Sequence, residues 1–278
     1  MPPLALALVL LSATLHATWN LLIARSRDTD VTTAVAVPIG ALLFLPFALP
    51  TWRIEPEAWP FLITSMVLEL VYLALLAAAY GRADLSLIYP LARGLAPVFV
   101  LVFGTVVLQL SNSPGEIVGV LAVGAGVMLV RGLGRGSPGS ADWPGTLLAL
   151  AVAVTIASYT LVDRQGLQYA SPTAYVVLAL GPPGLVYLVL VARRRGRWLV
   201  RSQVRPLTAF VGLAMFVGYG AALAALTIAP PASVAAARES SVVIATAMAA
   251  VFLHEKVGPR RFVGSILVVV GVGLLALT

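Results

Sequence analysis

Long apolar runs follow one another along the chain, and each is bounded by charged residues, proline or glycine. Most of the runs are close to the roughly 20 apolar residues that a helix needs to cross a bilayer. The pattern therefore predicts an all-α polytopic membrane protein with ten transmembrane helices. The expected spans are residues 3–24, 32–51, 60–80, 85–110, 115–130, 145–162, 173–192, 207–228, 232–252 and 262–278.

The composition favours lipid rather than water as the surroundings. Of the 278 residues, 60% are hydrophobic and 10% are charged, whereas about 25% of the residues of a soluble domain are charged. The absence of cysteine excludes disulfide bonds, thiolate-bound metals and a cysteine nucleophile. Only two histidines, His16 and His254, are available for a catalytic or metal centre. We therefore expect no enzyme activity, no cofactor and no bound metal.

The basic residues predict the topology. The net charge is +7, but lysine and arginine lie in short connectors between apolar runs, which argues against a nucleic-acid partner. The odd-numbered connectors hold two, one, two, six and three of them, fourteen in all, and the even-numbered connectors hold Arg53 and Arg164. Because basic connectors stay in the cytoplasm, we expect both termini outside, in the cytoplasmic (inner) membrane of a bacterium.

A weak internal repeat divides the chain into two halves. A shift of 145 residues places Arg93 on Arg238, and a shift of 140 places Trp19 on Tyr159. We therefore predict two five-helix repeats, residues 1–139 and 140–278. Because five is an odd number, the second repeat enters the membrane upside down, and a binding site is expected at the interface of the halves of one complete monomer. Glycines predict close packing of the fifth and tenth spans: Gly119, Gly124, Gly126, Gly264, Gly271 and Gly273.

Two short motifs add a resemblance to a known family. Leu253-His254-Glu255-Lys256 closes the ninth span, and His16-Ala17-Thr18-Trp19-Asn20 is followed by Arg25. With five plus five spans, the chain resembles the EamA-type, ten-helix branch of the drug/metabolite transporter superfamily. The resemblance implies secondary transport of small organic molecules, often export of amino acids driven by proton exchange. Members are commonly drawn with both termini in the cytoplasm, and here the charge count predicts the opposite.

Ionisable side chains inside the spans are the candidate functional groups. Each costs about 2.5–3.5 kcal/mol on insertion scales, so such groups usually face a wet cavity or one another. The predicted spans contain Glu69, Arg93, Arg238, Glu239 and His16. The repeat puts the two arginines on corresponding helices, where each guanidinium can hold a carboxylate through two parallel hydrogen bonds. The alternative is a pair of static struts, Arg93 with Glu69 and Arg238 with Glu239 or another acid.

Aromatic and hydroxyl side chains extend this set. On the third span Ser65, Glu69, Tyr72 and Tyr80 share one helix face, as expected of a cavity wall. The alternatives are an interfacial belt for the tyrosines and a packing role for His16. The residues expected to bind solute are Arg93, Arg238, Glu69, Tyr72, Tyr80, Trp19, His16, Tyr89, Tyr159, Tyr219 and Ser240.

These observations predict a secondary active transporter that exports small metabolites, such as amino acids or related zwitterionic and anionic solutes, by alternating access. The candidate proton-coupling groups are Glu69, Glu239 and His16, because burial favours the neutral form of a carboxyl group and histidine titrates near neutral pH. No nucleotide-binding P-loop is present, so the driving force would be a gradient. The alternative is a lipid or lipid-headgroup translocase with the same fold.

Overall fold

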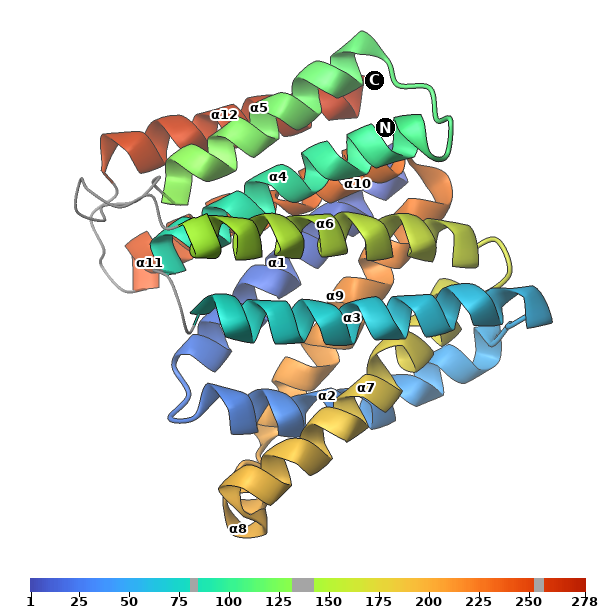
Figure 1. Cartoon of the computed structure of the whole chain (residues 1–278), viewed down its shortest axis with the longest axis vertical. Coiled ribbons are helices and arrows are strands. Elements are labelled where there is room, and N and C mark those ends of the chain that lie inside the picture. Colours follow the sequence, from blue (N-terminus) through green and yellow to red (C-terminus); the bar gives the residue numbers. More distant parts are fainter. Residues whose placement is uncertain (81–84, 132–142, 253–257) are drawn as a thin grey trace.

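The computed structural model describes the chain from residue 1 to residue 278 except for 81–84, 132–142 and 253–257, together with some side chains close to these gaps (Figure 1). The described part is helical, apart from an isolated β-bridge between Ile54 and Ala170. The helices are α1 (Pro3–Ala24), α2 (Thr29–Ala48), α3 (Trp59–Tyr80), α4 (Leu85–Val106), α5 (Pro114–Arg131), α6 (Trp143–Gly166), α7 (Pro172–Arg195), α8 (Arg197–Ser202), α9 (Pro206–Ile228), α10 (Pro231–Arg238), α11 (Ser240–Phe252) and α12 (Pro259–Leu277), with 3₁₀ turns at Leu49–Thr51 and Pro56–Ala58.

The predicted all-α class is confirmed, and each expected span overlaps a described helix. Within the described residues, six helices are long and apolar enough to cross a membrane, namely α1, α2, α6, α7, α9 and α12. Two shorter apolar stretches, Leu91–Val106 and Pro114–Val130, accompany them. The chain is therefore a membrane protein with multiple apolar helices.

The ninth expected span, 232–252, is not one helix. It is divided into α10 and α11 at Glu239, where four consecutive polar residues, 238–241, interrupt the apolar run. The backbone N–H of Glu239 donates to the carbonyl of Ala236, and the N–H of Val242 donates to the carbonyl of Glu239. These bonds span three residues rather than four and tighten the chain at the junction.

Helices α5 and α12 pack against each other at glycine positions. A Cβ atom added to Gly126 would lie 2.7 Å from the carbonyl oxygen of Gly264, and one added to Gly271 would lie 2.8 Å from that of Gly119. The predicted close approach of these two helices is thus confirmed. Gly124 differs, because it faces the carbonyl of Gly94 on α4, and a Cβ on Gly273 would meet nothing within 4 Å.

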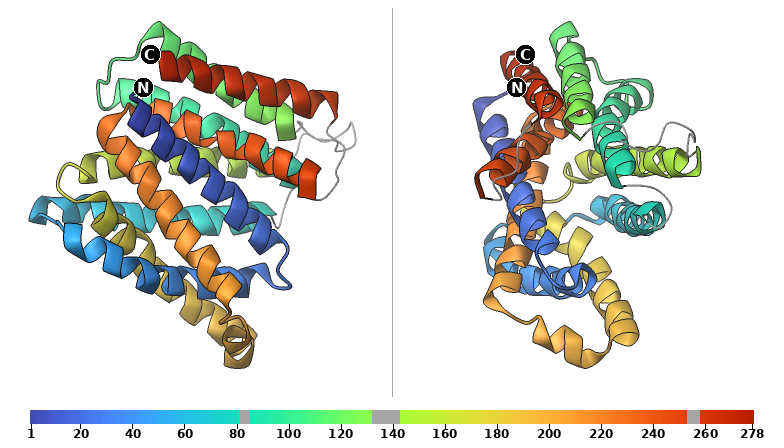
Figure 2. Two further views of the ribbon diagram at one scale, coloured as in Figure 1. Left: turned by 180° about the vertical axis from the view of Figure 1, so that it is seen from behind. Right: turned by 90° about the vertical axis from the view of Figure 1, so that its left-hand side faces the viewer.

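The remaining packing joins the first half of the chain to the second. Helix α1 lies beside α9, as the left view of Figure 2 shows, and α3 lies beside α6. Helix α2 packs on both α7 and α9, and α4 packs on α6, while α1 also contacts α10 and α11. Neighbours in space therefore come mostly from opposite halves.

Several of the described connectors of the same parity lie close to one another. The even connectors 52–58 and 167–171 are joined at Ile54 and Ala170, and the two termini are adjacent, since the amino group of Met1 donates to the carbonyl of Leu275 at 3.0 Å. The start of α2 and the end of α7, which border the first and the seventh connector, are joined by an ion pair of 3.6 Å between Asp30 and Arg195.

Candidate functional site

A small cavity lies among α4, α6, α9 and the α10–α11 junction, and we call it the arginine cavity. Its volume is about 30 Å³, the room of about one water molecule. Its lining holds four charged residues amid apolar ones, and two tyrosines. The charged and aromatic lining residues are Arg93, Arg238, Asp163, Glu239, Tyr159 and Tyr219.

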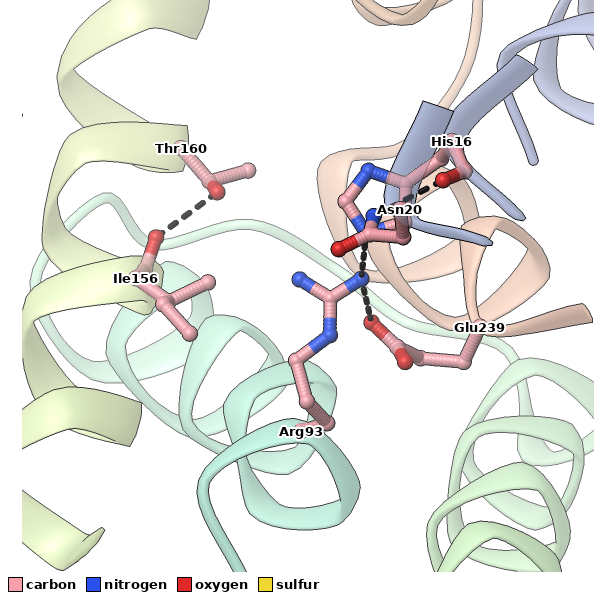
Figure 3. A network of polar contacts seen from close by, with 6 residues as sticks. All are labelled: His16, Asn20, Arg93, Ile156, Thr160 and Glu239. Atoms are coloured by element: carbon pink, nitrogen blue, oxygen red, sulfur yellow. Dashed lines mark hydrogen bonds and ion pairs between the residues drawn. The ribbon is translucent and has the colours of Figure 1, made fainter. Parts of the chain in front are cut away.

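Arg93 joins three helical elements at the cavity. Its Nη2 atom lies 3.2 Å from Oε1 of Glu239 and 3.2 Å from Nε2 of His16 (Figure 3). The side chains of Arg93 and Glu239 are 8% and 5% exposed, so this is a buried ion pair. The pairings named in the strut alternative are not observed: within the described residues Arg93 pairs with Glu239 rather than with Glu69, and Glu69 forms no ion pair.

Arg238 ends α10 and has an aromatic partner instead of an acid. Its guanidinium carbon lies 5.4 Å from the centre of the Tyr219 ring, within the range of a cation–π contact. Its buried Nε atom has no hydrogen-bond partner in the described part of the chain. This guanidinium therefore faces the cavity with hydrogen-bonding capacity left for an anion.

Asp163 lines the cavity although its position in the sequence did not predict this. It is 0% exposed, and its Oδ1 accepts hydrogen bonds from Ser65 Oγ at 2.6 Å and Tyr175 Oη at 3.0 Å, while Oδ2 accepts one from the hydroxyl of Tyr219. The expected span ended at 162, but α6 continues to Gly166 and keeps Asp163 inside. The signal that could have found it is its spacing of four from Tyr159, which puts both on one helix face.

The predicted stripe on α3 faces α6. Ser65 on that stripe donates to Asp163, and the ring of Tyr72 meets that of Tyr159 edge-on, with centroids 6.3 Å apart. Glu69 is partly exposed and interacts electrostatically with Asp163 and Arg238. Neither Glu69 nor Tyr72 lines the arginine cavity itself.

The other expected solute-binding residues divide into three groups. Trp19 stands edge-on against His16 at 4.8 Å but does not line the cavity. The buried hydroxyl of Ser240 has no hydrogen-bond partner among the described residues. The side chains of Tyr80 and Tyr89 lie outside the described part, as does the whole motif Leu253–Lys256.

A second, larger cavity of about 700 Å³ lies where the termini meet. It is lined by Ser111, Asn112 and Ser113 of the α4–α5 connector and by the terminal residues. The buried carboxylate of Glu116 lines it too and accepts a hydrogen bond from Ser233 at 2.8 Å. Because Ser233 belongs to α10, this helix runs from the larger cavity to the arginine cavity.

Three comparisons bear on identity. Residues 143–277 match the model of the EamA-like transporter family. No curated protein matches the chain. A solved structure described as "Crystal structure of protein" superimposes with a TM-score of 0.75 at 18% identity, over 99% of this chain and 97% of that one. At this identity the likeness concerns the fold alone.

Proposed function

Because the chain belongs to the drug/metabolite transporter superfamily, through its match to the EamA-like family, we propose that it exports small zwitterionic or anionic metabolites, such as amino acids. It is a membrane transporter of this type. In the proposal the solute binds in the arginine cavity. The family match favours this reading over the lipid-translocase alternative.

The proposal rests on the surroundings of the Arg238 guanidinium. An uncompensated charge is costly in a membrane protein. The partly exposed Arg238 has no ion pair within the described residues and lies over the Tyr219 ring, with Glu69 and Asp163 acting on it from beyond ion-pair distance. An incoming carboxylate would supply the missing hydrogen bonds. Arg93, already bound to Glu239 and His16, also lines the cavity.

Alternating access would be provided by two inverted repeats, residues 1–139 and 140–278. In such a fold a contact between two helices recurs between their counterparts in the other half. The packing supports this: α1 with α9 corresponds to α6 with α3, and α5 packs on its own counterpart α12. The small volume of the arginine cavity fits a contracted state that must open before a solute enters.

Proton exchange would drive the export, with Glu69, Glu239 and His16 as the coupling groups. Glu239 and His16 both contact Arg93, so protonation of either would change the charge beside the solute. Glu69 lies near Arg238 and Asp163. We place the transporter in a bacterial inner membrane as a monomer, with both termini outside.

Transport by the purified protein in proteoliposomes tests the proposal. The panel contains amino acids and organic anions, and the variants are Arg238→Ala, Arg93→Ala and Glu69→Gln. We expect a solute of the panel to be carried and its affinity to fall at least about tenfold in Arg238→Ala, the equivalent of one lost charge-assisted interaction.

The control is Arg53→Ala, whose side chain is 55% exposed and belongs to a surface ion pair. It should transport at the rate of the unsubstituted protein. If Arg238→Ala and Arg93→Ala also do so, the arginine cavity is not the solute site.

A further inference from the structure

Asp163 is a buried acid whose charge is held by hydroxyl groups rather than by a base. Its three donors, Ser65, Tyr175 and Tyr219, belong to α3, α7 and α9. Hydroxyl donors to a carboxylate form strong, charge-assisted hydrogen bonds. In the described part of the chain no arginine lies within ion-pair distance of Asp163. Its negative charge is therefore not cancelled by a fixed salt bridge.

The lining of the arginine cavity contains equal numbers of basic and acidic groups. Arg93 and Glu239 form the direct ion pair. The other two, Arg238 and Asp163, are separated by Tyr219, whose hydroxyl binds Asp163 and whose ring lies under the guanidinium of Arg238. One positive and one negative group are thus held apart beside the same small cavity.

This arrangement discriminates between solutes by charge. A net charge in surroundings of low polarity is costly unless an opposite charge is beside it. An anionic solute on Arg238 would leave the negative charge of Asp163 in excess, and Glu69 nearby would add to it. A solute with an amino group beside its carboxylate leaves the balance unchanged, because the ammonium offsets Asp163.

We propose that Asp163 sets the charge preference of this transporter, by selecting zwitterionic solutes over anions that differ only in lacking the amino group. The inference rests on the proposed function, since it takes the arginine cavity as the solute site. The carboxylate of Asp163 attracts the ammonium group of the solute, while Arg238 binds the carboxylate of the solute. Tyr219 holds the two sites side by side, because it contacts both Asp163 and Arg238.

Matched solute pairs test the role of Asp163. Each pair has one side chain, with and without the amino group: leucine and 4-methyl-2-oxopentanoate, phenylalanine and phenylpyruvate, alanine and pyruvate. Proteoliposomes take up each labelled compound at the same concentration, and the preference is the ratio of the two rates. We expect the ratio to favour the amino acid and to fall by about tenfold or more in Asp163→Asn, because one favourable charge contact is lost.

Ser65→Ala is the matched control, because it removes one donor to the same carboxylate but keeps the charge. Its ratio should equal that of the unsubstituted protein even if its rates are lower. Arg238→Gln provides an independent measurement on a less buried residue. With the charge of Asp163 left in excess, this variant should bind leucinamide, the cation with the leucine side chain, in preference to leucine.

The outcomes separate the two proposals. If both members of a pair lose rate equally in Asp163→Asn, or if Arg238→Gln gains no preference for leucinamide, Asp163 is a structural residue and the inference is wrong. If the unsubstituted protein carries no member of these pairs and no other amino acid or organic anion of the wider panel, the proposed function fails, and the role of Asp163 fails with it.

Discussion

Arg93 and Arg238 are equivalent under the shift of 145 residues, yet their surroundings differ. The residue after Arg238 is Glu239, which binds Arg93, whereas the residue after Arg93 is Gly94. Gly94 faces α5, where a Cβ atom would lie 3.0 Å from the carbonyl oxygen of Gly124. At this position the first half therefore has a glycine that allows close helix packing, and the second half has a charged residue. We infer that the two arginines have different roles despite their corresponding positions.

Glu239→Gln should destabilise the protein because it leaves the buried guanidinium of Arg93 without its acid. Removing one partner of a buried ion pair costs about 3–5 kcal/mol. We expect a clearly lower thermal unfolding midpoint in detergent. Glu55→Gln breaks the exposed pair with Arg53 and should change stability by at most about 1 kcal/mol. Equal midpoints for the two variants would contradict the structural importance of the buried pair.

At the scale of the helices, two features matter for the site: the junction of α10 and α11, and the contact of α5 with α12. At the junction the helix ends beside the arginine cavity, so Arg238 and Glu239 point to their different partners from one short turn. At the α5–α12 contact the glycines let two backbones approach, which stabilises helix pairs in membranes. One element positions charges, and the other provides a rigid support.

Gly126→Ala should loosen the contact of α5 with α12, because its Cβ would lie within 3 Å of backbone atoms of Gly264 and Val268. Overpacking of this kind costs about 1–3 kcal/mol. Gly273→Ala, on α12, adds a methyl group where nothing lies within 4 Å, and should leave the unfolding midpoint unchanged or raise it slightly. A lower midpoint for Gly273→Ala than for Gly126→Ala would refute this account of the interface.

At the scale of the whole molecule, the distribution of basic residues and the contacts between connectors both distinguish two ends. One end gathers both termini and the even connectors, which carry few basic residues. The other joins the α1–α2 connector to the end of α7, next to the arginine cluster around α8. With the basic end in the cytoplasm, the cavity of Glu116 would open to the outside.

Labelling of single cysteines tests this orientation, and the chain is suited to it because it has no cysteine of its own. Gln168→Cys lies in the α6–α7 connector, and Trp198→Cys replaces a side chain that is 81% exposed on α8. In intact cells of the expression host, a membrane-impermeant maleimide should label the first and not the second. After the membrane is permeabilised, both should react. The reverse pattern would show that the termini lie in the cytoplasm.

The sequence predicted most of the helices and several of the residues that line the arginine cavity. Helix bounds agree within a few residues, with α6 a turn longer than expected. Arg93, Arg238, Glu239, Tyr159 and Tyr219 were expected at the site and line one cavity. Asp163 was missed because it lies beside Arg164 at the end of an apolar run, where both residues look like a connector. The observed ion pair of Arg93 with Glu239 differs from the pairs named in the strut alternative, because helical spacing within one span says nothing of the rotation of its neighbours.

The sequence by itself determined the class of the protein, the helical segments and the distribution of basic connectors. These depend on local quantities, because the length and apolar content of a run decide by its own transfer free energy how well it is stabilised in lipid. Only the tertiary structure decided which buried charges meet: Arg93 with Glu239 and His16, Asp163 with three hydroxyl groups, and Arg238 with Tyr219. Each of these contacts joins different helices, and its geometry depends on how the helices rotate and cross when glycine contacts and buried polar groups are satisfied together.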